Sequence, residues 1–122
     1  MTKKTIFIVD DAEITRVTLN NALSDDYTVV AMDSADKMMK IIQRIMPDLI
    51  MMDYYMPGLT FHETMRHLKE SDRFANIPVV VMSGSNYPEL LMEIKAMGAV
   101  GFLSKPVEDK TTLLAFVEKH LQ

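Results

Sequence analysis

Short apolar runs alternate with helix-like segments from one end of the chain to the other. The runs at 49–52 and 79–82 are apolar at every position. A strand that is apolar on both sides has to be covered on both sides, which is typical of parallel sheets with helices on each face. Five strand-like segments, each followed by a helix-like one, therefore predict a single α/β domain.

The ends of these segments follow from local signals. Thr60 and Glu63 have the spacing of a capping box, Pro88 suits a first helical turn, and Gly98 suits a helix end. In the first helix, Ile14 and Val17 lie on one stripe with Thr18, and Leu19, Ala22 and Leu23 lie nearby. The expected strands cover 5–9, 27–32, 49–53, 78–83 and 101–104. The expected helices cover 12–23, 34 to Pro47, 60–71, 88–98, and the segment that starts at Glu108 or Asp109.

Composition excludes several classes of protein. The 122 residues are the usual size of one domain, so one domain is expected over 1–122. There is no cysteine, which excludes disulfides and thiolate zinc sites. The net charge is −4 without a basic block, so direct nucleic-acid binding is not expected. Without a long apolar run or a signal-peptide core at the first residues, no membrane association and a cytoplasmic location are expected.

Charged or reactive side chains stand at the carboxyl ends of the predicted strands. Asp10 and Asp11 follow the first strand, Asp53 ends the third, Ser83 ends the fourth and Lys105 follows the fifth. Right-handed crossovers give a doubly wound sheet, and such sheets bind ligands beyond the carboxyl ends of their strands. With the strand order 2-1-3-4-5, the first and third strands are neighbours, so the three aspartates converge.

Three converging carboxylates repel one another unless a proton or a cation separates them. Oxygen ligands with an open coordination position suit Mg²⁺. Beside such an ion, Asp53 is suited to act as a nucleophile that takes up a phosphoryl group. Lys105 supplies a positive charge and Ser83 a hydroxyl donor, which are the positioning and charge stabilisation that phosphoryl transfer requires.

Taken singly, these residues have ordinary structural explanations. Asp10 with Glu13 has capping-box spacing, and Asp53 is an acceptable turn residue before Met56-Pro57. Ser83 is an acceptable strand-end hydroxyl, and Lys105 an acceptable solvated lysine. The structural explanation has to hold at four of the five strand ends at once, so the joint pattern favours a phosphoryl-transfer site.

Several segments carry a resemblance to a known family. They are Ile8-Val9-Asp10-Asp11, Pro47-Asp48-Leu49-Ile50-Met51-Met52-Asp53, Met56-Pro57, Val81-Met82-Ser83-Gly84, Gly98-Ala99 and Lys105-Pro106. Over essentially its full length, the chain resembles the receiver domains of two-component response regulators. The chemotaxis member of that family is a known example of the strand order 2-1-3-4-5, so the order assigned above rests partly on the resemblance. A flavodoxin-like three-layer α/β/α fold is implied.

The resemblance also implies roles for individual residues. Asp53 is implied as the phosphoacceptor, and Asp11 and Asp53 as direct ligands of Mg²⁺. Asp10 would act partly through water, and the backbone carbonyl of Tyr55 would complete the protein ligands. Lys105 would pair with the acceptor carboxylate or its phosphate.

A switch and a set of partners are implied in the same way. Ser83 and Phe102 correspond to the family's hydroxyl and aromatic switch pair. The phosphoryl donor would be a histidine kinase or a histidine phosphotransfer protein. The domain would not be a classical enzyme, although it would catalyse its own Mg²⁺-dependent phosphorylation and dephosphorylation. The surface of the fourth helix, fifth strand and fifth helix would control an effector protein or effector domain.

The sequence says less about how the domain passes its signal on. No effector domain follows the fifth helix, so the chain is expected to be either a stand-alone regulator or a receiver from a longer protein. Some receivers dimerise through a charged pattern on the output surface. The segment 98–104 lacks that pattern, which leaves a phosphorylation-dependent homodimer as an open alternative.

Two features depart from the family pattern or carry no role. Thr60-Phe61 stands where the family commonly has Asp-Gly, which leaves the path of the loop after the third strand undecided. The three histidines, His62, His67 and His120, have no cysteines beside them and are expected to be solvated surface residues.

Three other functions fit parts of the sequence. A phosphatase with an aspartyl nucleophile usually has a second acid two residues later, where this chain has Tyr55. A flavodoxin-type electron carrier needs a phosphate loop rich in small residues after the first strand, where Asp10 and Asp11 would repel the flavin phosphate. A degenerate receiver that acts only in docking would not need the full set of charged site residues.

Overall fold

A five-stranded parallel sheet forms the centre of the computed structural model, which describes residues 2–107 and 109–121. Its strand order is β2-β1-β3-β4-β5, which confirms the doubly wound fold. Each observed strand matches an expected one to within a residue. The strands are β1 (Thr5–Val9), β2 (Thr28–Met32), β3 (Leu49–Asp53), β4 (Val79–Ser83) and β5 (Gly101–Ser104).

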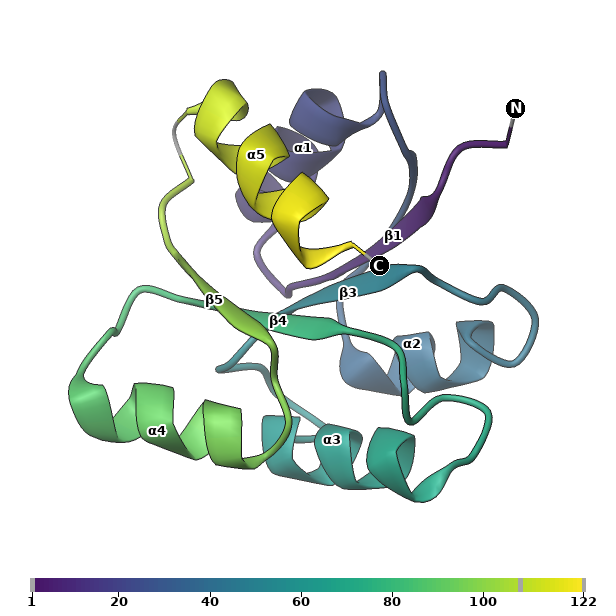
Figure 1. Ribbon diagram of the computed structural model, residues 1–122, viewed down its shortest axis with the longest axis vertical. Coiled ribbons are helices and arrows are strands. Elements are labelled where there is room, and N and C mark those ends of the chain that lie inside the picture. Colours follow the sequence, from purple (N-terminus) through teal and green to yellow (C-terminus); the bar gives the residue numbers. More distant parts are fainter. Residues whose placement is uncertain (1, 108, 122) are drawn as a thin grey trace.

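Helices cover both faces of the sheet (Figure 1). One face carries α1 (Glu13–Leu23) and α5 (Lys110–His120), and the other carries α2 (Ala35–Ile41), α3 (Phe61–Glu70) and α4 (Pro88–Ala96). Successive strand side chains point to opposite faces, so each face has its own apolar core. Phe7 and Val9 pack with α2, α3 and α4, whereas Ile6 and Ile8 pack with α1 and α5.

The central strands are buried more completely than the outer ones. All residues of β3 and of β4 are buried, as their uninterrupted apolar sequences predict. β2 and β5 form the two edges of the sheet and are mostly half-buried or exposed. The strands that carry Asp53 and Ser83 are therefore buried along their whole length.

The helix starts agree with the local signals better than the helix ends do. Ser34 Oγ accepts a hydrogen bond from the backbone N–H of Lys37, and Asp109 caps α5. Glu108, the alternative start of α5, lies outside the described residues. α2 is shorter than expected, because the chain continues after Ile41 as turns, in which the N–H groups of Arg44 and Ile45 both donate to the carbonyl of Ile41.

The buried side of α1 differs from the stripe picked out in the sequence. Ile14 is 74% exposed and Val17 is 46% exposed, whereas Leu19 and Leu23 are fully buried. Apolar residues occupy both sides of this helix, so periodicity alone does not indicate which side meets the sheet.

The loop between β3 and α3 takes a defined path despite its departure from the family pattern. Gly58 adopts a positive φ of 85°, a conformation that L-residues with a side chain rarely adopt. The Oδ2 atom of Asp36 accepts a hydrogen bond from the N–H of Leu59 at 3.2 Å. The predicted capping box between Thr60 and Glu63 is formed, and Phe61 is buried.

Candidate functional site

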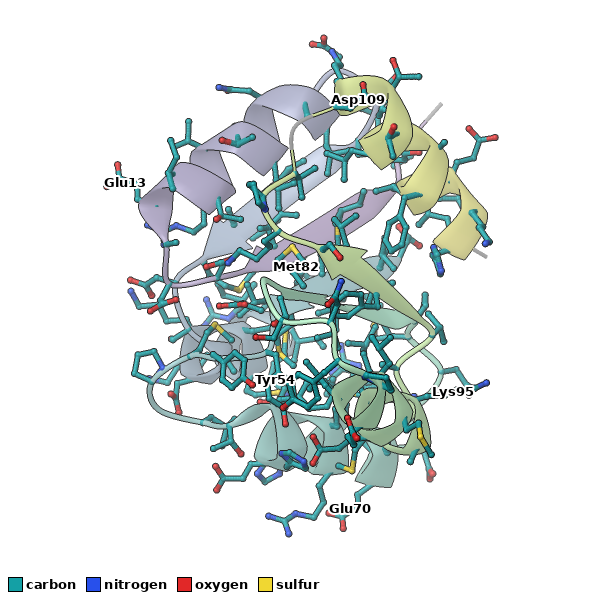
Figure 2. All side chains as sticks on the ribbon, turned by 90° about the vertical axis from the view of Figure 1, so that its left-hand side faces the viewer. Glu13, Tyr54, Glu70, Met82, Lys95 and Asp109 are labelled. Atoms are coloured by element: carbon teal, nitrogen blue, oxygen red, sulfur yellow. The ribbon has the colours of Figure 1, made fainter. Side chains whose placement is uncertain are left out.

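The carboxyl ends of the strands meet at one edge of the sheet, and Figure 2 looks onto this edge. The parallel register pairs Val9 with Met52 and Asp53 with Met82, so the ends of β1, β3 and β4 lie level. The N–H of Lys105 donates to the carbonyl of Ser83 at 2.9 Å, which joins the end of β5 to them. The predicted strand-end residues are therefore brought together.

Asp10, Asp11 and Asp53 form a compact acidic cluster. One carboxylate oxygen from each of them lies within 4.8 Å of the other two. Asp10 is fully buried and Asp53 is 6% exposed, while Asp11 is exposed to solvent. Two buried acids beside one solvent-exposed acid are suited to holding a cation that enters from solvent.

Lys105 lies between the two buried acids of the cluster. Its Nζ atom is 2.8 Å from Oδ2 of Asp10 and 3.5 Å from Oδ1 of Asp53. The other oxygen of Asp10 accepts a hydrogen bond from the N–H of Ala12 at 2.9 Å. Lys105 therefore contacts Asp10 more closely than Asp53, and both oxygens of Asp10 are already engaged.

The capping-box explanation of Asp10 and Glu13 is wrong. The N-cap residue of α1 is Ala12, which has no side-chain cap. Asp10 lies two residues before that position, and its carboxylate is directed to Lys105 and to the backbone of Ala12.

The electrostatics of the cluster are unbalanced without a metal. Burial raises the pKa of Asp53 to about 6, and the charges of Asp10 and Asp11 add to this effect, while Lys105 opposes it. Burial lowers the pKa of Lys105, but the hydrogen bond to Asp10 and the charge of Asp53 outweigh it, so that this pKa lies above its ordinary value. One lysine does not neutralise three acids, and a divalent cation would reverse the shift at Asp53.

Ser83 and Phe102, the predicted switch pair, lie in different environments. Ser83 is buried at the end of β4, and its Oγ accepts a hydrogen bond from the N–H of Ser85 at 3.0 Å. Phe102 is half-buried in β5 and packs against the core beneath α3 and α4. It also lines an open groove of about 590 Å³ between α4 and β5 with Leu91 and Val100.

Tyr55 lies at the border of the site and is 55% exposed. Its predicted role in metal binding involves only the backbone carbonyl. Its ring contacts the ring of Tyr54 edge-on, with the centroids 4.7 Å apart.

A second polar cluster was not anticipated from the sequence. The hydroxyl of Tyr54 donates to Oε2 of Glu93 at 2.6 Å, and Oε1 of Glu93 is 2.9 Å from Nε2 of His62. His62 and His67 are exposed as expected, but His62 is paired. His120 is part-buried, with Nδ1 2.8 Å from the carbonyl oxygen of Phe116, so its expected solvation is wrong.

Sequence separation explains why this cluster was missed. Glu93 is 39 positions from Tyr54 and 31 from His62, and the three residues belong to no motif. The only local signal is the tyrosine immediately after Asp53, which does not indicate a partner on α4.

Comparison with known proteins places the chain among signalling domains. A family model described as "Response regulator receiver domain" matches residues 6–118. The two-component response regulator ORR6 of Oryza sativa subsp. japonica is 35% identical over 106 residues, a match that covers 84% of this chain and 62% of that protein. The chain thus spans less than two thirds of the length of this relative.

Solved structures agree with the fold. The chemotaxis protein CheY4 of Vibrio cholerae superposes with a TM-score of 0.91 at 26% identity, over 98% of this chain and all of that one. The receiver domain of the sensor histidine kinase PA1611 of Pseudomonas aeruginosa PAO1 has a TM-score of 0.86 at 17% identity, with 98% of both chains covered. That structure has a magnesium ion coordinated in its active site cleft. In the described part of this chain, no helix has the length and apolar character needed to span a membrane.

Proposed function

This chain belongs to the response regulator receiver domain family, and on that premise we propose that Asp53 accepts a phosphoryl group in a reaction that depends on Mg²⁺. The domain is a signalling module rather than a classical enzyme. The observation that supports the choice of Asp53 is its place at the end of β3, beside Lys105 and within 4.8 Å of two further carboxylates. An acid in that position is crowded by negative charge, and a cation relieves the crowding.

The oxygen atoms of the cluster fit a hard divalent cation. Asp11 and Asp53 would hold Mg²⁺ directly, with the backbone carbonyl of Tyr55. Asp10 would act through water, since Lys105 and the N–H of Ala12 already occupy its oxygens. Carboxylates, a carbonyl and water are the ligands that Mg²⁺ prefers, and the magnesium reported for the PA1611 receiver domain supports this assignment. When bound, the ion supplies positive charge close to the phosphoryl oxygens.

The chain's own residues then position the transfer. A carboxylate oxygen of Asp53 attacks phosphorus, and the bond from phosphorus to the donor atom breaks. With a phosphohistidine donor, that electron pair remains on the imidazole nitrogen, which takes a proton from solvent. Lys105 keeps its positive charge beside Asp53 throughout and faces the oxygens of the incoming group.

The same residues provide a route from phosphorylation to a change of surface. A phosphoryl group on Asp53 offers new acceptor oxygens to the hydroxyl of Ser83, which at present accepts from the N–H of Ser85. If Ser83 turns to donate to the phosphoryl group, the loop that follows it has to move. Phe102 then repacks on β5, and the surface formed by α4, β5 and α5 changes its shape.

The proposed donor is a histidine kinase or a histidine phosphotransfer protein, and the proposed receiver of the signal is an effector protein or effector domain. The domain would also take phosphate from small-molecule donors and remove it by hydrolysis, both with Mg²⁺. A homodimer formed on phosphorylation is an alternative output, which sizing with and without beryllofluoride would detect.

The direct test uses acetyl phosphate, Mg²⁺ and intact mass measurement. Wild-type protein should gain one phosphoryl group that is lost at high pH, and chelation of the metal should prevent the gain. Asp53→Asn should gain none, because its amide oxygen is a poor nucleophile. Asp25→Asn serves as the matched control, since Asp25 is an exposed acid that does not belong to the cluster. Labelling of Asp53→Asn to the wild-type level would refute the proposal.

A further inference from the structure

Glu93 ties α4 to the junction between β3 and α3. One of its carboxylate oxygens accepts a hydrogen bond from the hydroxyl of Tyr54 at 2.6 Å, and the other is 2.9 Å from Nε2 of His62. In Figure 2, Tyr54 lies beside α4. A single side chain of α4 thus connects three separate elements.

Tyr54 links this contact to both parts of the proposed phosphorylation switch. It directly follows Asp53, and its N–H donates to the carbonyl of Met82 at 2.9 Å. Met82 in turn directly precedes Ser83. The group that holds α4 is therefore one residue away from the phosphoacceptor in β3, and is hydrogen-bonded to the residue before the switch hydroxyl in β4.

Aromatic packing fixes the position of Tyr54. Its ring centroid is 5.3 Å from that of Phe61 and 6.1 Å from that of His62. Phe61 stands where the family commonly has glycine and is 3% exposed, so the ring of Tyr54 packs against a buried neighbour. The hydrogen bond from Tyr54 and then that from His62 lower the pKa of Glu93, which keeps the carboxylate ionised as an acceptor.

The rest of α4 is held less firmly. Only Leu90 and Ile94 of this helix are buried, while Met92 is 72% exposed. At Gly84, in the loop that leads from β4 to α4, a Cβ would have no neighbour within 4 Å. Gly84, Asn86 and Tyr87 of this loop are exposed, so the loop is lightly packed, and the contact at Glu93 adds a polar tether to the two buried side chains that hold α4.

We infer that Glu93 is a positioning residue that holds α4 in its unphosphorylated arrangement. The inference rests on the proposed function, in which Ser83 moves toward a phosphoryl group on Asp53. Residues 84–87 join Ser83 to the first turn of α4, so that movement pulls the helix while Tyr54 stays with β3. A contact that is present only in the unphosphorylated arrangement stabilises that arrangement and opposes the change to the phosphorylated one. Its removal should therefore favour the phosphorylated arrangement.

The test measures the binding of beryllofluoride, a mimic of the phosphoryl group, by calorimetric titration at saturating Mg²⁺. Glu93→Ala should bind it about 5- to 10-fold more tightly than wild type, the lower end of the range of a typical coupling between two sites. Glu89→Ala is the matched control, because Glu89 is an exposed acid on the same helix that does not contact Tyr54 or His62. It should bind beryllofluoride as wild type does.

Two further variants separate positioning from a purely structural role. Tyr54→Phe removes the hydroxyl and should tighten binding in the same direction, and the double variant Tyr54→Phe/Glu93→Ala should add nothing to Glu93→Ala. Glu93→Gln keeps an oxygen for the tyrosine hydroxyl and should return the affinity toward the wild-type value. A purely structural residue would lower the denaturant midpoint without tightening the binding of beryllofluoride.

The outcomes distinguish this inference from the proposed function. If wild type binds beryllofluoride and Glu93→Ala binds it equally or more weakly, Glu93 does not hold the unphosphorylated arrangement, and the proposed function stands. If wild type itself binds none in the presence of Mg²⁺, the proposed function fails and the role of Glu93 fails with it.

Discussion

The acidic edge of the sheet and the outer face of α4 and β5 are built in opposite ways. At the acidic edge, charged and polar side chains are buried, and β3 is covered at each of its five positions. On the outer face, apolar side chains are exposed, including Leu91, Met92 and Val100, and every residue of β5 is at least partly accessible. The acidic edge buries polar side chains, which usually face water, and the outer face exposes apolar side chains, which are usually buried.

The difference is informative because the two regions are joined through Tyr54 and Glu93. Buried polar groups are tolerated only where each has a partner, and no buried side-chain polar atom in residues 2–107 and 109–121 lacks one. Such an arrangement has few alternatives and is suited to chemistry. An edge strand beside a lightly packed helix opens at a lower free-energy cost than a buried central strand, which suits a surface that changes shape.

Core substitutions should reveal the largest contrast. Ile50→Ala in β3 removes a fully buried side chain and should cost about 3 kcal/mol of unfolding free energy, because it leaves a cavity in a strand that is buried at every position. Leu103→Ala in β5 removes a half-buried side chain and should cost about 1 kcal/mol. Urea denaturation of both variants measures the difference. Equal losses would show that the edge strand is packed as firmly as the centre.

Removal of the positive charge of Lys105 should have the next largest effect on stability. Lys105→Ala leaves Asp10 buried without its ion pair, and should lower the unfolding free energy by about 2 kcal/mol in metal-free buffer. Added Mg²⁺ should restore part of this loss by replacing the positive charge. Lys110→Ala breaks an exposed contact to Asp25 of 3.8 Å and should change stability by less than about 0.5 kcal/mol. A Lys105→Ala variant as stable as the Lys110→Ala control would contradict this account of the edge.

The pH dependence of stability should report on Asp53 directly. Its pKa of about 6 lies above the ordinary value of 3.8, so its ionised form costs the folded state free energy above pH 6. As the pH falls through 6, the folded protein takes up a proton that the unfolded chain does not, and this cost disappears. Asp53→Asn should therefore be more stable than wild type at pH 8 in metal-free buffer, by about 1 to 3 kcal/mol, the upper value being the full equivalent of the pKa shift, and this advantage should shrink toward pH 5. Chemical denaturation across this range, with and without Mg²⁺, measures it. A constant difference would mean that the carboxylate is not crowded.

The smallest effect is expected on the outer face. Met92→Gln replaces a side chain that is 72% exposed, and should change the unfolding free energy by less than about 0.5 kcal/mol. Labelling by acetyl phosphate should be unchanged, because Met92 makes no contact with the acidic cluster. A loss of more than about 1 kcal/mol would show that this face is covered in the folded protein, for instance by a second copy.

Most of the fold was predictable from local pattern. The bounds of β1, β3 and β5 agree with the expectation to the residue, because short segments rich in β-branched and apolar residues, bounded by polar or turn residues, are typical of strands. The placement of Asp10, Asp53, Ser83 and Lys105 at one edge follows from the parallel sheet. The stripe at Ile14 and Val17 shows where periodicity fails. α1 has apolar residues on two sides, and only packing against the sheet decides which side is buried.

The sequence by itself determined the order of the elements, the helix caps at Ser34, Thr60 and Asp109, and the residues at the strand ends, since these depend mostly on neighbours in the chain. The tertiary structure alone decided that Lys105 pairs more closely with Asp10 than with Asp53, and that Glu93 reaches Tyr54 and His62. These contacts join residues that are far apart in the chain, and their distances depend on where each helix lies on the sheet. The position of a helix is set by many weak packing contacts, which no short motif encodes.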